Sequence, residues 1–511
     1  MAEVSLSQPM SIAEKIPEVA KFDKLTAGSV IRGRRVVRYI PSTGQTVSSS
    51  SGSAITTFRI SDSNAYLDPQ SCYLTFIAAI PQFTAAADLS GTAGGILPDD
   101  TAISFFQRVR SEMNSVQMDD IQNVNSLAHS LIYLLGDKQA YCQDLGLLAG
   151  SWKFNDFNWG SAEQTNATST SGSVAAAFDS EGSFAAVQRR GQVAWRLLYS
   201  AAGAATTNST YYLQYAIPLS YFGFGLFRQQ QLIPLRNMGV LTLNFYTAQA
   251  AQALRGGCAR DAITGGTLGL DGAITYSPSF TLSQLSIVGA VCDMASDYTE
   301  LVDRIATTSE TGITMGFDSF TNVQAGYNAI LSTSPADRSI TFSRATTSLR
   351  NMYLVRQPSA WANNLGKCSV TGFPWMNCVG FRVQVNSQYF PESNSLDNPV
   401  EQYAFARQGH GLLGNQNAIG NTRVEGWTTT ASANSDVNGQ HVLACGFDRV
   451  TSEYLSLDGL STISSGGTIT VYLKDGGSVD AGGVGNPITV NAWLESTRFL
   501  VLRMNQVSVV G

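Results

Sequence analysis

Charged residues are scarce in this sequence. Of the 511 residues only 14% are Asp, Glu, Lys or Arg, whereas about 25% is usual for soluble domains. The formal net charge of −6 excludes the global positive field that coating of nucleic acid requires. Aromatic residues at 10% and apolar residues at 44% are too frequent for a disordered chain. We therefore expect a folded protein whose low-charge surface suits packing against copies of itself.

Paired cysteines and long apolar runs are also missing. The 7 cysteines are scattered and never form a C-x-x-C pattern, which argues against a disulfide framework or a structural zinc site and favours free thiols in a reducing compartment. The polar N-terminus lacks the apolar core of a signal peptide. No run approaches the roughly 18 apolar residues of a membrane span, so we expect neither a signal peptide nor a membrane-spanning segment.

Reactive constellations are absent from the sequence. The three histidines, His129, His410 and His441, lie far apart and outside any H-E-x-x-H pattern. No phosphate-binding P-loop and no G-x-S-x-G nucleophile elbow occurs. Residues 409–414 match G-x-G-x-x-G, but the pattern continues as a loop, and dinucleotide binding needs a helix that opens there. We therefore expect no enzyme, no catalytic residue, no cofactor and no metal site.

Three further motifs have plain structural interpretations. The adjacent acids Asp119 and Asp120 suit the N-terminus of a helix. The aromatic phrase at residues 221–227 is interpreted as core or interface packing rather than as a stacking platform for bases. Asn166 and Asn208 begin N-x-[ST] patterns in expected loops, and we expect them to be unmodified because no secretory signal precedes them.

Alternation of apolar and polar residues dominates from residue 54 onward and predicts β-strands. The predicted strands are 54–60, 72–80, 105–113, 193–199, 211–219, 240–246, 280–288, 313–317, 349–356, 381–386, 468–473, 488–494 and 499–504. From residue 54 onward two connections are predicted to be helical, from Asp119 to Leu135 and from Val400 to Arg407. Long segments rich in turn residues link the strands, and such loops project from the ends of a β-sandwich.

A long, weak internal repeat divides the sequence. In the first half a strand over 105–113 is followed by an Asn114-Ser115 turn, an extended return and a helix. In the second half a strand over 381–385 is followed by an Asn386-Ser387 turn, an extended return and the helix near Val400. The strands at 240–246 and 468–473 correspond in the same order. We predict two copies of one β-module, at 54–255 and 279–511, joined by a linker at 256–278.

Residues 1–53 form an expected N-terminal arm. Ser11 to Glu14 has capping-box spacing, and Ile12, Ile16, Val19 and Ala20 recur at helical intervals, although Pro17 disturbs a helix after one turn. Four arginines without an acid follow, at Arg32, Arg34, Arg35 and Arg38. Two interpretations stay open for them: a strand with a solvated basic face, or an arm that touches nucleic acid, phospholipid or an acidic neighbour.

Three phrases carry a resemblance to a known family. The first phrase runs from residues 58–60 to residues 67–69 and includes the strand that ends at Ile80. The second runs from Ile217-Pro218-Leu219 through residues 232–234 to residues 241–243. The third closes the second module and covers residues 447–473. Together they resemble the double jelly-roll major capsid proteins of DNA viruses, in particular those of virophages, polinton-like viruses and adintoviruses. The likeness spans most of residues 30–511 and rests on element order and short apolar phrases.

The resemblance implies an all-β fold of two tandem eight-stranded jelly rolls with short helices in the connections. It implies a structural protein of the virion, made in the host cytoplasm or nucleus, whose homotrimers form pseudo-hexagonal capsomers of an icosahedral shell. Implied partners are the chain itself, neighbouring capsomers, penton and minor capsid proteins, and an inner membrane or the genome through the N-terminal arm. Arg32, Arg34, Arg35 and Arg38 would then face the capsid interior.

Two alternatives remain open at this stage. A single jelly-roll shell domain followed by a protruding β-domain, as in small RNA-virus capsids, would have unlike halves. A carbohydrate-binding or carbohydrate-cleaving β-sandwich would carry two carboxylates in a cleft lined by aromatic residues.

Overall fold

The fold is taken from a computed structural model of the chain. It describes residues 30–49, 54–81, 95–99, 101–134, 146–150, 210–257, 279–308, 312–328, 336–362, 370, 372–392, 394–410, 441–447, 459–463, 466–475, 487–504 and 506–510. Two of the expected features, the strand at 193–199 and the glycosylation patterns at Asn166 and Asn208, lie outside these residues. The expected loop segments lie largely outside them as well.

The first half of the chain forms two facing antiparallel sheets. One sheet has the order β1-β12-β4-β8, made of Ile31–Tyr39, Thr281–Met294, Ala65–Pro81 and Thr210–Pro218, with β2 (Val47–Ser48) beside β12 and β9 (Ile233–Pro234) beside β4. The other has the order β3-β10-β6-β7, made of Ile55–Ile60, Leu241–Thr247, Phe106–Met113 and Val116–Gln122. A small two-stranded sheet pairs β5 (Gly95–Pro98) with β11 (Leu254–Gly257).

The second half repeats this arrangement. One sheet has the order β13-β20-β15-β18, made of Ile313–Asn328, Pro487–Arg503, Leu349–Pro358 and Leu443–Gly446, with β21 (Gln506–Val510) beside β20. The other has the order β14-β19-β16-β17, made of Ala336–Ser343, Thr468–Asp475, Cys378–Val385 and Gln388–Phe390. The expected strands at 488–494 and 499–504 are one continuous strand, β20, of 17 residues.

Both halves have the same strand order. If the eight main strands of each half are numbered along the chain, one sheet reads first-eighth-third-sixth and the other second-seventh-fourth-fifth in both cases. This pairing of the outermost strands with each other is the order of a jelly roll, which is a double-sheet sandwich built from two Greek keys. The predicted repeat is therefore confirmed at the level of topology, and the alternative of unlike halves is not supported.

The division between the rolls differs from the expected one. β1, which was placed in the N-terminal arm, pairs with β12 over Ile31 to Tyr39. The sequence pattern predicts β12 as part of the second module, but β12 pairs with β1 and β4 and is the last strand of the first roll. The joint between the rolls is thus the helix α12 (Ser296–Thr308) rather than residues 256–278. The reason is that strand periodicity shows where a strand lies, whereas its sheet depends on pairing partners far away in sequence.

The Asn-Ser pairs that suggested the repeat occupy equivalent turns. Asn114-Ser115 closes the two-residue hairpin between β6 and β7, with Met113 opposite Val116. Asn386-Ser387 closes the hairpin between β16 and β17, with Val385 opposite Gln388. Asn114 and Asn386 have φ values of 48° and 58°, a conformation that tight hairpins require and that Asn tolerates better than most residues.

Helices are short and lie in connections, as predicted, but one begins later than expected. Asp119 and Asp120 belong to strand β7, and the helix α2 starts at Val124 behind Asn123 and continues as a π-helical segment over His129–Leu134. The predicted helix start at Asp119 is therefore wrong, because pairing of β7 with β6 outweighs the capping preference of the two acids. The second predicted helix is confirmed as α13 (Pro399–Gly409), with Asn398 as its N-cap.

The remaining helices are single turns at the ends of strands. They are α4 (Gly146–Ala149), α9 (Gly225–Arg228), α10 (Leu235–Met238), α11 (Ala250–Ala253) and the 3-10 turns at Ala102–Phe105, Leu219–Phe222 and Ser359–Trp361. In the described part of the chain no helix is long and apolar enough to cross a bilayer.

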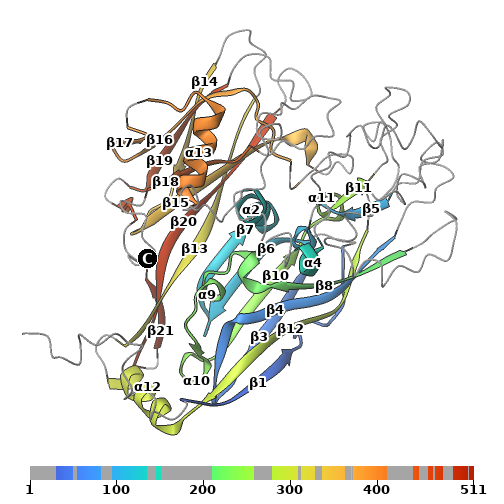
Figure 1. The fold of residues 1–511 in the computed structure, drawn as a ribbon, viewed down its shortest axis with the longest axis vertical. Helices are drawn as coiled ribbons and strands as arrows, with labels where there is room; N and C mark the ends of the chain where they lie inside the picture. The colour runs from blue at the N-terminus through green and yellow to red at the C-terminus, as the bar shows by residue number, and fades with distance from the viewer. Residues whose placement is uncertain are drawn as a thin grey trace, which may run out of the picture.

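Each roll buries its own core between its two sheets, and the first core continues into the contact between the rolls. The buried aromatic residues of the first roll contact one another edge to face, for example Phe106 with Phe245 at 5.5 Å between ring centroids. The second roll has its own cluster around Leu354, Val383 and Val471. Figure 1 shows the two rolls side by side, with α12 at one end of the molecule.

Candidate functional site

The four arginines predicted as an inward-facing basic arm lie on β1, an edge strand of the first roll. Arg34 is 2.9 Å from the carboxylate of Asp68, and Arg35 is 2.5 Å from that of Asp62 and 3.9 Å from that of Asp293. Arg32 donates a hydrogen bond to Ser296 at 3.3 Å, and Arg38 is exposed. Of the two interpretations left open, the strand with a solvated basic face describes the local structure.

The acids around β1 offset much of its positive charge. Asp62, Asp68 and Asp293 come from the turn after β3, from β4 and from β12, so no stretch of sequence shows their approach to the arginines. An exposed ion pair of this kind contributes at most about 1 kcal/mol to stability. Its larger effect here is on the local field, which is far weaker than four arginines alone would produce.

A second feature, which the sequence did not predict, is a polar seam between the rolls. We call seam the contact of β7 and α9, from the first roll, with β13 and β20, from the second. The indole N–H of Trp493 donates to the backbone oxygen of Gln122 at 3.1 Å, and Arg498 donates to that of Met118 at 2.8 Å. Trp493 is fully buried. These bonds use free backbone groups of β7, the edge strand of its sheet.

An ion pair crosses the seam beside these bonds. Arg228 of α9 lies 3.1 Å from Glu495 of β20, whose side chain is only 6% exposed. Glu495 also accepts hydrogen bonds from Asn351 at 2.8 Å and from the hydroxyl of Tyr353 at 3.4 Å. The Arg228 guanidinium stacks 5.2 Å from the ring centre of Phe320. A buried carboxylate with three donors is well compensated, which is the condition under which a buried charge is tolerated.

Asp119 is buried at the same seam. Its carboxylate accepts a hydrogen bond from the hydroxyl of Ser111 at 2.9 Å. Burial raises the pKa of the Asp119 carboxyl, while the hydrogen bond from Ser111 and the charge of Arg498 act in the opposite direction. Asp119 is therefore a strand residue that lies near the charge of Arg498 from the second roll, instead of capping a helix.

The rolls approach each other closely at Gly225. A Cβ atom at this position would overlap the backbone oxygen of Asp318 and lie 2.6 Å from the Phe317 ring. Glycine is thus required for α9 to contact β13 at this distance. The seam is consequently a tight joint in which backbone meets backbone.

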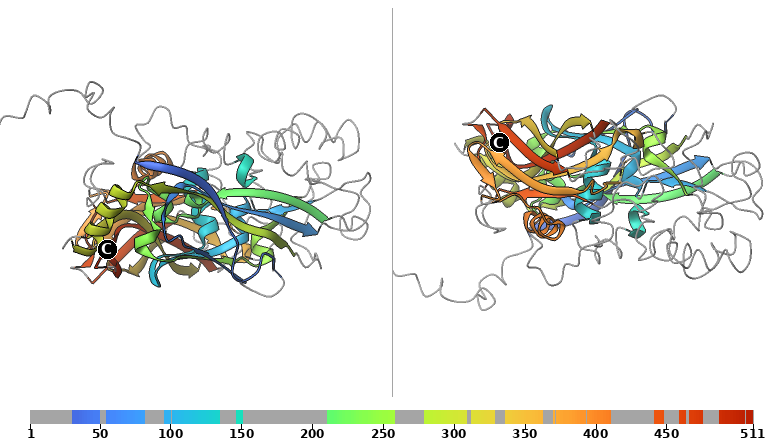
Figure 2. Two further views of the ribbon diagram at one scale, coloured as in Figure 1. Left: turned by 90° about the horizontal axis from the view of Figure 1, so that it is seen from below. Right: turned by 90° about the horizontal axis from the view of Figure 1, so that it is seen from above.

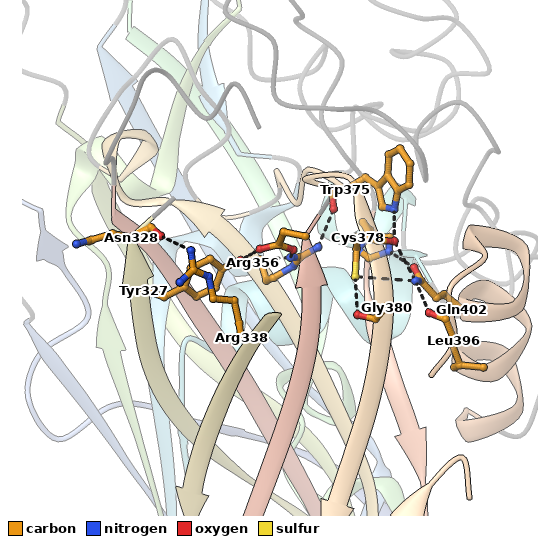
Figure 3. Close-up of polar contacts among 11 residues, drawn as sticks. Tyr327, Asn328, Arg338, Arg356, Trp375, Cys378, Gly380, Leu396 and Gln402 are labelled. Atoms are coloured by element: carbon orange, nitrogen blue, oxygen red, sulfur yellow. Dashed lines mark hydrogen bonds and ion pairs between the residues drawn. The ribbon is translucent and has the colours of Figure 1, made fainter. Parts of the chain in front are cut away.

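A third polar cluster lies inside the second roll. The Arg356 side chain on β15 is only 1% exposed and lies 2.5 Å from Asp475 at the end of β19. It also donates to the hydroxyl of Tyr327 at 3.2 Å and to the backbone oxygen of Trp375 at 2.7 Å, as Figure 3 shows. Because β15 and β19 belong to opposite sheets, this cluster links the two sheets at one end of the roll.

The three histidines pack against other side chains of the fold. The His441 ring lies 3.0 Å from the amide oxygen of Gln402, and burial lowers its pKa well below the usual value. Burial and the nearby Arg228 and Arg407 lower the pKa of His410 to about 4. His129 packs on Phe373 with 5.8 Å between ring centroids. Among the residues that the structure covers, no group of three His, Cys, Asp or Glu side chains is placed to hold a metal ion.

Of the other motifs, the structure tests the aromatic phrase. The G-x-G-x-x-G match begins at Gly409, which is the last residue of α13, and its residues 411–414 lie outside the described part of the chain. In the aromatic phrase Phe222, Phe224 and Phe227 are at most 1% exposed, which confirms core packing. The acids of the seam are buried against the opposite roll, which is unlike the open aromatic cleft of a carbohydrate-active enzyme.

No protein-family model matches the chain, and no curated protein sequence matches it either. Solved structures do. A chain of the Sputnik virophage aligns with a TM-score of 0.55 and 13% identity over 95% of this chain and 89% of that one. The major capsid protein of mavirus aligns with a TM-score of 0.51 and 10% identity over 100% and 96% of the two chains. The chain has a double jelly-roll fold. The Faustovirus major capsid protein aligns similarly, with a TM-score of 0.51, 10% identity and coverage of 94% and 93%.

Proposed function

We propose that this double jelly-roll chain is the major capsid protein of an icosahedral DNA virus and acts by self-assembly, without catalysing a reaction. The observation that carries the proposal is the pair of rolls with identical strand order, which are joined by a tight seam. Two equivalent sandwiches side by side make a block whose threefold repetition approximates a hexagon, which is a shape that tiles a shell. Major capsid proteins of mavirus and Faustovirus have this fold.

We further propose that the chain forms a homotrimer. Support comes from the low content of charged residues, 14%, because the centres of protein interfaces are depleted of charge. Symmetric, closed assemblies are also the rule for self-associating chains. Neighbouring capsomers, penton proteins and minor capsid proteins belong to the same proposal as further partners, with the virion as the location.

The β1 arginines enter the proposal in a restricted form. We propose that the face carrying Arg32, Arg34, Arg35 and Arg38 is turned to the capsid interior, where the genome or an inner membrane would lie. Because Arg34 and Arg35 already contact acids, their contribution to phosphate binding is expected to be small. Any strong contact with the genome would then need residues outside β1.

The mass of the purified protein tests the assembly proposal. Light scattering at micromolar concentration is expected to give three times the chain mass of 54.6 kDa, and electron microscopy of the same sample is expected to show hexagonal particles. A stable monomer at all concentrations, without shells in the presence of crowding agents, would contradict the proposal. If the Arg38→Ala variant still forms a trimer, Arg38 is not required for the contacts between subunits.

A further inference from the structure

The helix that joins the two rolls has a wider apolar face than it buries. Val302 and Ala306 of α12 pack against the molecule and are 9% and 0% exposed. Tyr298, Leu301 and Ile305 continue the same face but are 39%, 52% and 37% exposed. Their spacing of three and four residues places them on one side of the helix. Figure 2 shows α12 on the outside of the molecule when it is seen from below.

Other exposed apolar residues adjoin this helix face. Met504, at the end of the last long strand, is 63% exposed, and its backbone N–H donates to the oxygen of Ala306 at 2.8 Å. We call Tyr298, Leu301, Ile305 and Met504 the α12 patch. A single exposed apolar residue is ordinary, whereas a cluster on one helix face marks a contact surface.

The start of β1 brings the N-terminal segment to this patch. The backbone oxygen of Val30 accepts a hydrogen bond from the N–H of Ala295, the residue directly before α12. Arg32 reaches Ser296, the first residue of α12. The 29 residues that precede Val30 are therefore tethered at one end of the patch.

The preceding segment has the composition that the patch requires. Residues 11–22 include the apolar side chains of Ile12, Ile16, Val19 and Phe22, together with two acids and two lysines at positions 14, 18, 15 and 21. Asp297, Glu300 and Arg304 of α12 are exposed beside the patch. The apolar side chains of the segment can thus cover the patch, while charges of both signs on the segment and on α12 can pair at its edge.

The residues between the segment 11–22 and Val30 form a tether whose length allows the segment to reach the patch and keeps it nearby. The seven residues 23–29 span up to about 24 Å when extended, and a helix of 13 residues is about 20 Å long. A tether of this length holds the segment at an effective concentration in the millimolar range. Binding in place therefore needs only the modest affinity that a few buried apolar side chains supply.

We propose that residues 11–22 dock on the α12 patch of the same chain. The docked segment covers the joint between the rolls and fixes the N-terminal arm at this end of the molecule. The inference does not depend on shell formation, since it concerns contacts within one chain.

Site-specific photocrosslinking tests the docking. A benzoylphenylalanine at position 301 of the full chain is expected to crosslink to peptides from residues 11–22. A mixture of isotopically light and heavy chains should give crosslinks within one isotope only. Crosslinks between light and heavy chains would mean that a second copy occupies the patch, and crosslinks to other regions or none would equally overturn the proposal. The control probe replaces Val400, which is 69% exposed on α13, and is expected not to reach residues 11–22.

Limited proteolysis gives an independent measurement. Trypsin can cut after Lys15 and Lys21, and docking is expected to slow these cuts. In the variant L301S/I305S the cuts should become at least about tenfold faster, which corresponds to loss of about 1.4 kcal/mol of docking free energy. V400S should cut at the wild-type rate. Equal rates in all three proteins, with unchanged melting temperatures, would overturn the proposal. Either result leaves the capsid proposal untouched, because that proposal is tested by mass and particle shape.

Discussion

Arg228 of the first jelly roll and Glu495 of the second form an ion pair of 3.1 Å across the joint between the two rolls. The residues are 267 positions apart in sequence. Glu495 is buried, so its negative charge depends on the neighbouring donors, whereas Arg228 is partly exposed and still contacts solvent. The two rolls are thereby expected to unfold as one unit.

Removing one partner of this pair should therefore destabilise the whole chain. In Arg228→Met the buried Glu495 carboxylate keeps only Asn351 and Tyr353 as donors. We expect the free energy of unfolding to fall by about 2 kcal/mol. This is below the usual range for fully buried pairs, because Arg228 is partly exposed. Urea denaturation of the single variants and of R228M/E495Q gives the coupling energy. Additive losses would show that the two side chains do not interact energetically.

The close approach at Gly225 makes a second prediction. In Gly225→Ala the new methyl group would overlap the Asp318 backbone oxygen, so the seam must open, with an expected loss of about 1 to 3 kcal/mol. Gly33→Ala is the matched control, because its nearest neighbour, a carboxylate oxygen of Asp293, would be 3.6 Å away. Thermal melting of both variants measures the difference. Equal melting temperatures would refute a tight seam at α9.

The buried Arg356 cluster predicts the largest single effect. Arg356→Met would leave Asp475 and Tyr327 without their cation inside the second roll, and we expect destabilisation by about 3 to 5 kcal/mol. Arg356→Lys should recover only part of it, because an ammonium group cannot reproduce the planar fork of contacts. Arg59→Met, at an exposed position on β3, is the control and should change stability by less than about 0.5 kcal/mol. Chemical denaturation with tryptophan fluorescence reports all three.

Stability should fall as the pH is lowered from 6.5 to 4. Burial, Arg228 and Arg407 lower the pKa of His410 to about 4 in the folded chain, whereas it is about 6.5 in an unfolded chain. Between these values the unfolded state binds more protons, so stability is full above pH 6.5 and decreases toward pH 4. His441, whose pKa is also lowered by burial, acts in the same direction.

The corresponding variant isolates the contribution of His410. In His410→Asn the loss of stability between pH 7.5 and pH 5 should be smaller than in the wild type by about 1 kcal/mol, allowing for partial exposure of the ring. The comparison uses the difference between the two pH values, so any uniform effect of the substitution cancels. An unchanged pH dependence would show that His410 titrates normally in the folded chain.

Much of the fold was predictable because strands and tight turns leave local signals. Alternating side chains located β10, β16 and most other described strands, and the two Asn-Ser hairpins correctly indicated a repeated module. The absence of catalytic motifs and the resemblance of short phrases also needed only the sequence. These features depend on neighbours within a few residues, where side-chain alternation and backbone preference act.

The tertiary structure decided how these strands are assigned and joined. Pairing of β12 with β1 and β4 moved the boundary between the rolls to α12, and acids distant in sequence met the arginines of β1. The Arg228–Glu495 pair and the overlap site at Gly225 had no local signal, and helical spacing alone does not show that the α12 patch is exposed. Strand pairing, charge compensation and exposure are set by groups that lie far apart along the chain, so only the folded molecule shows them.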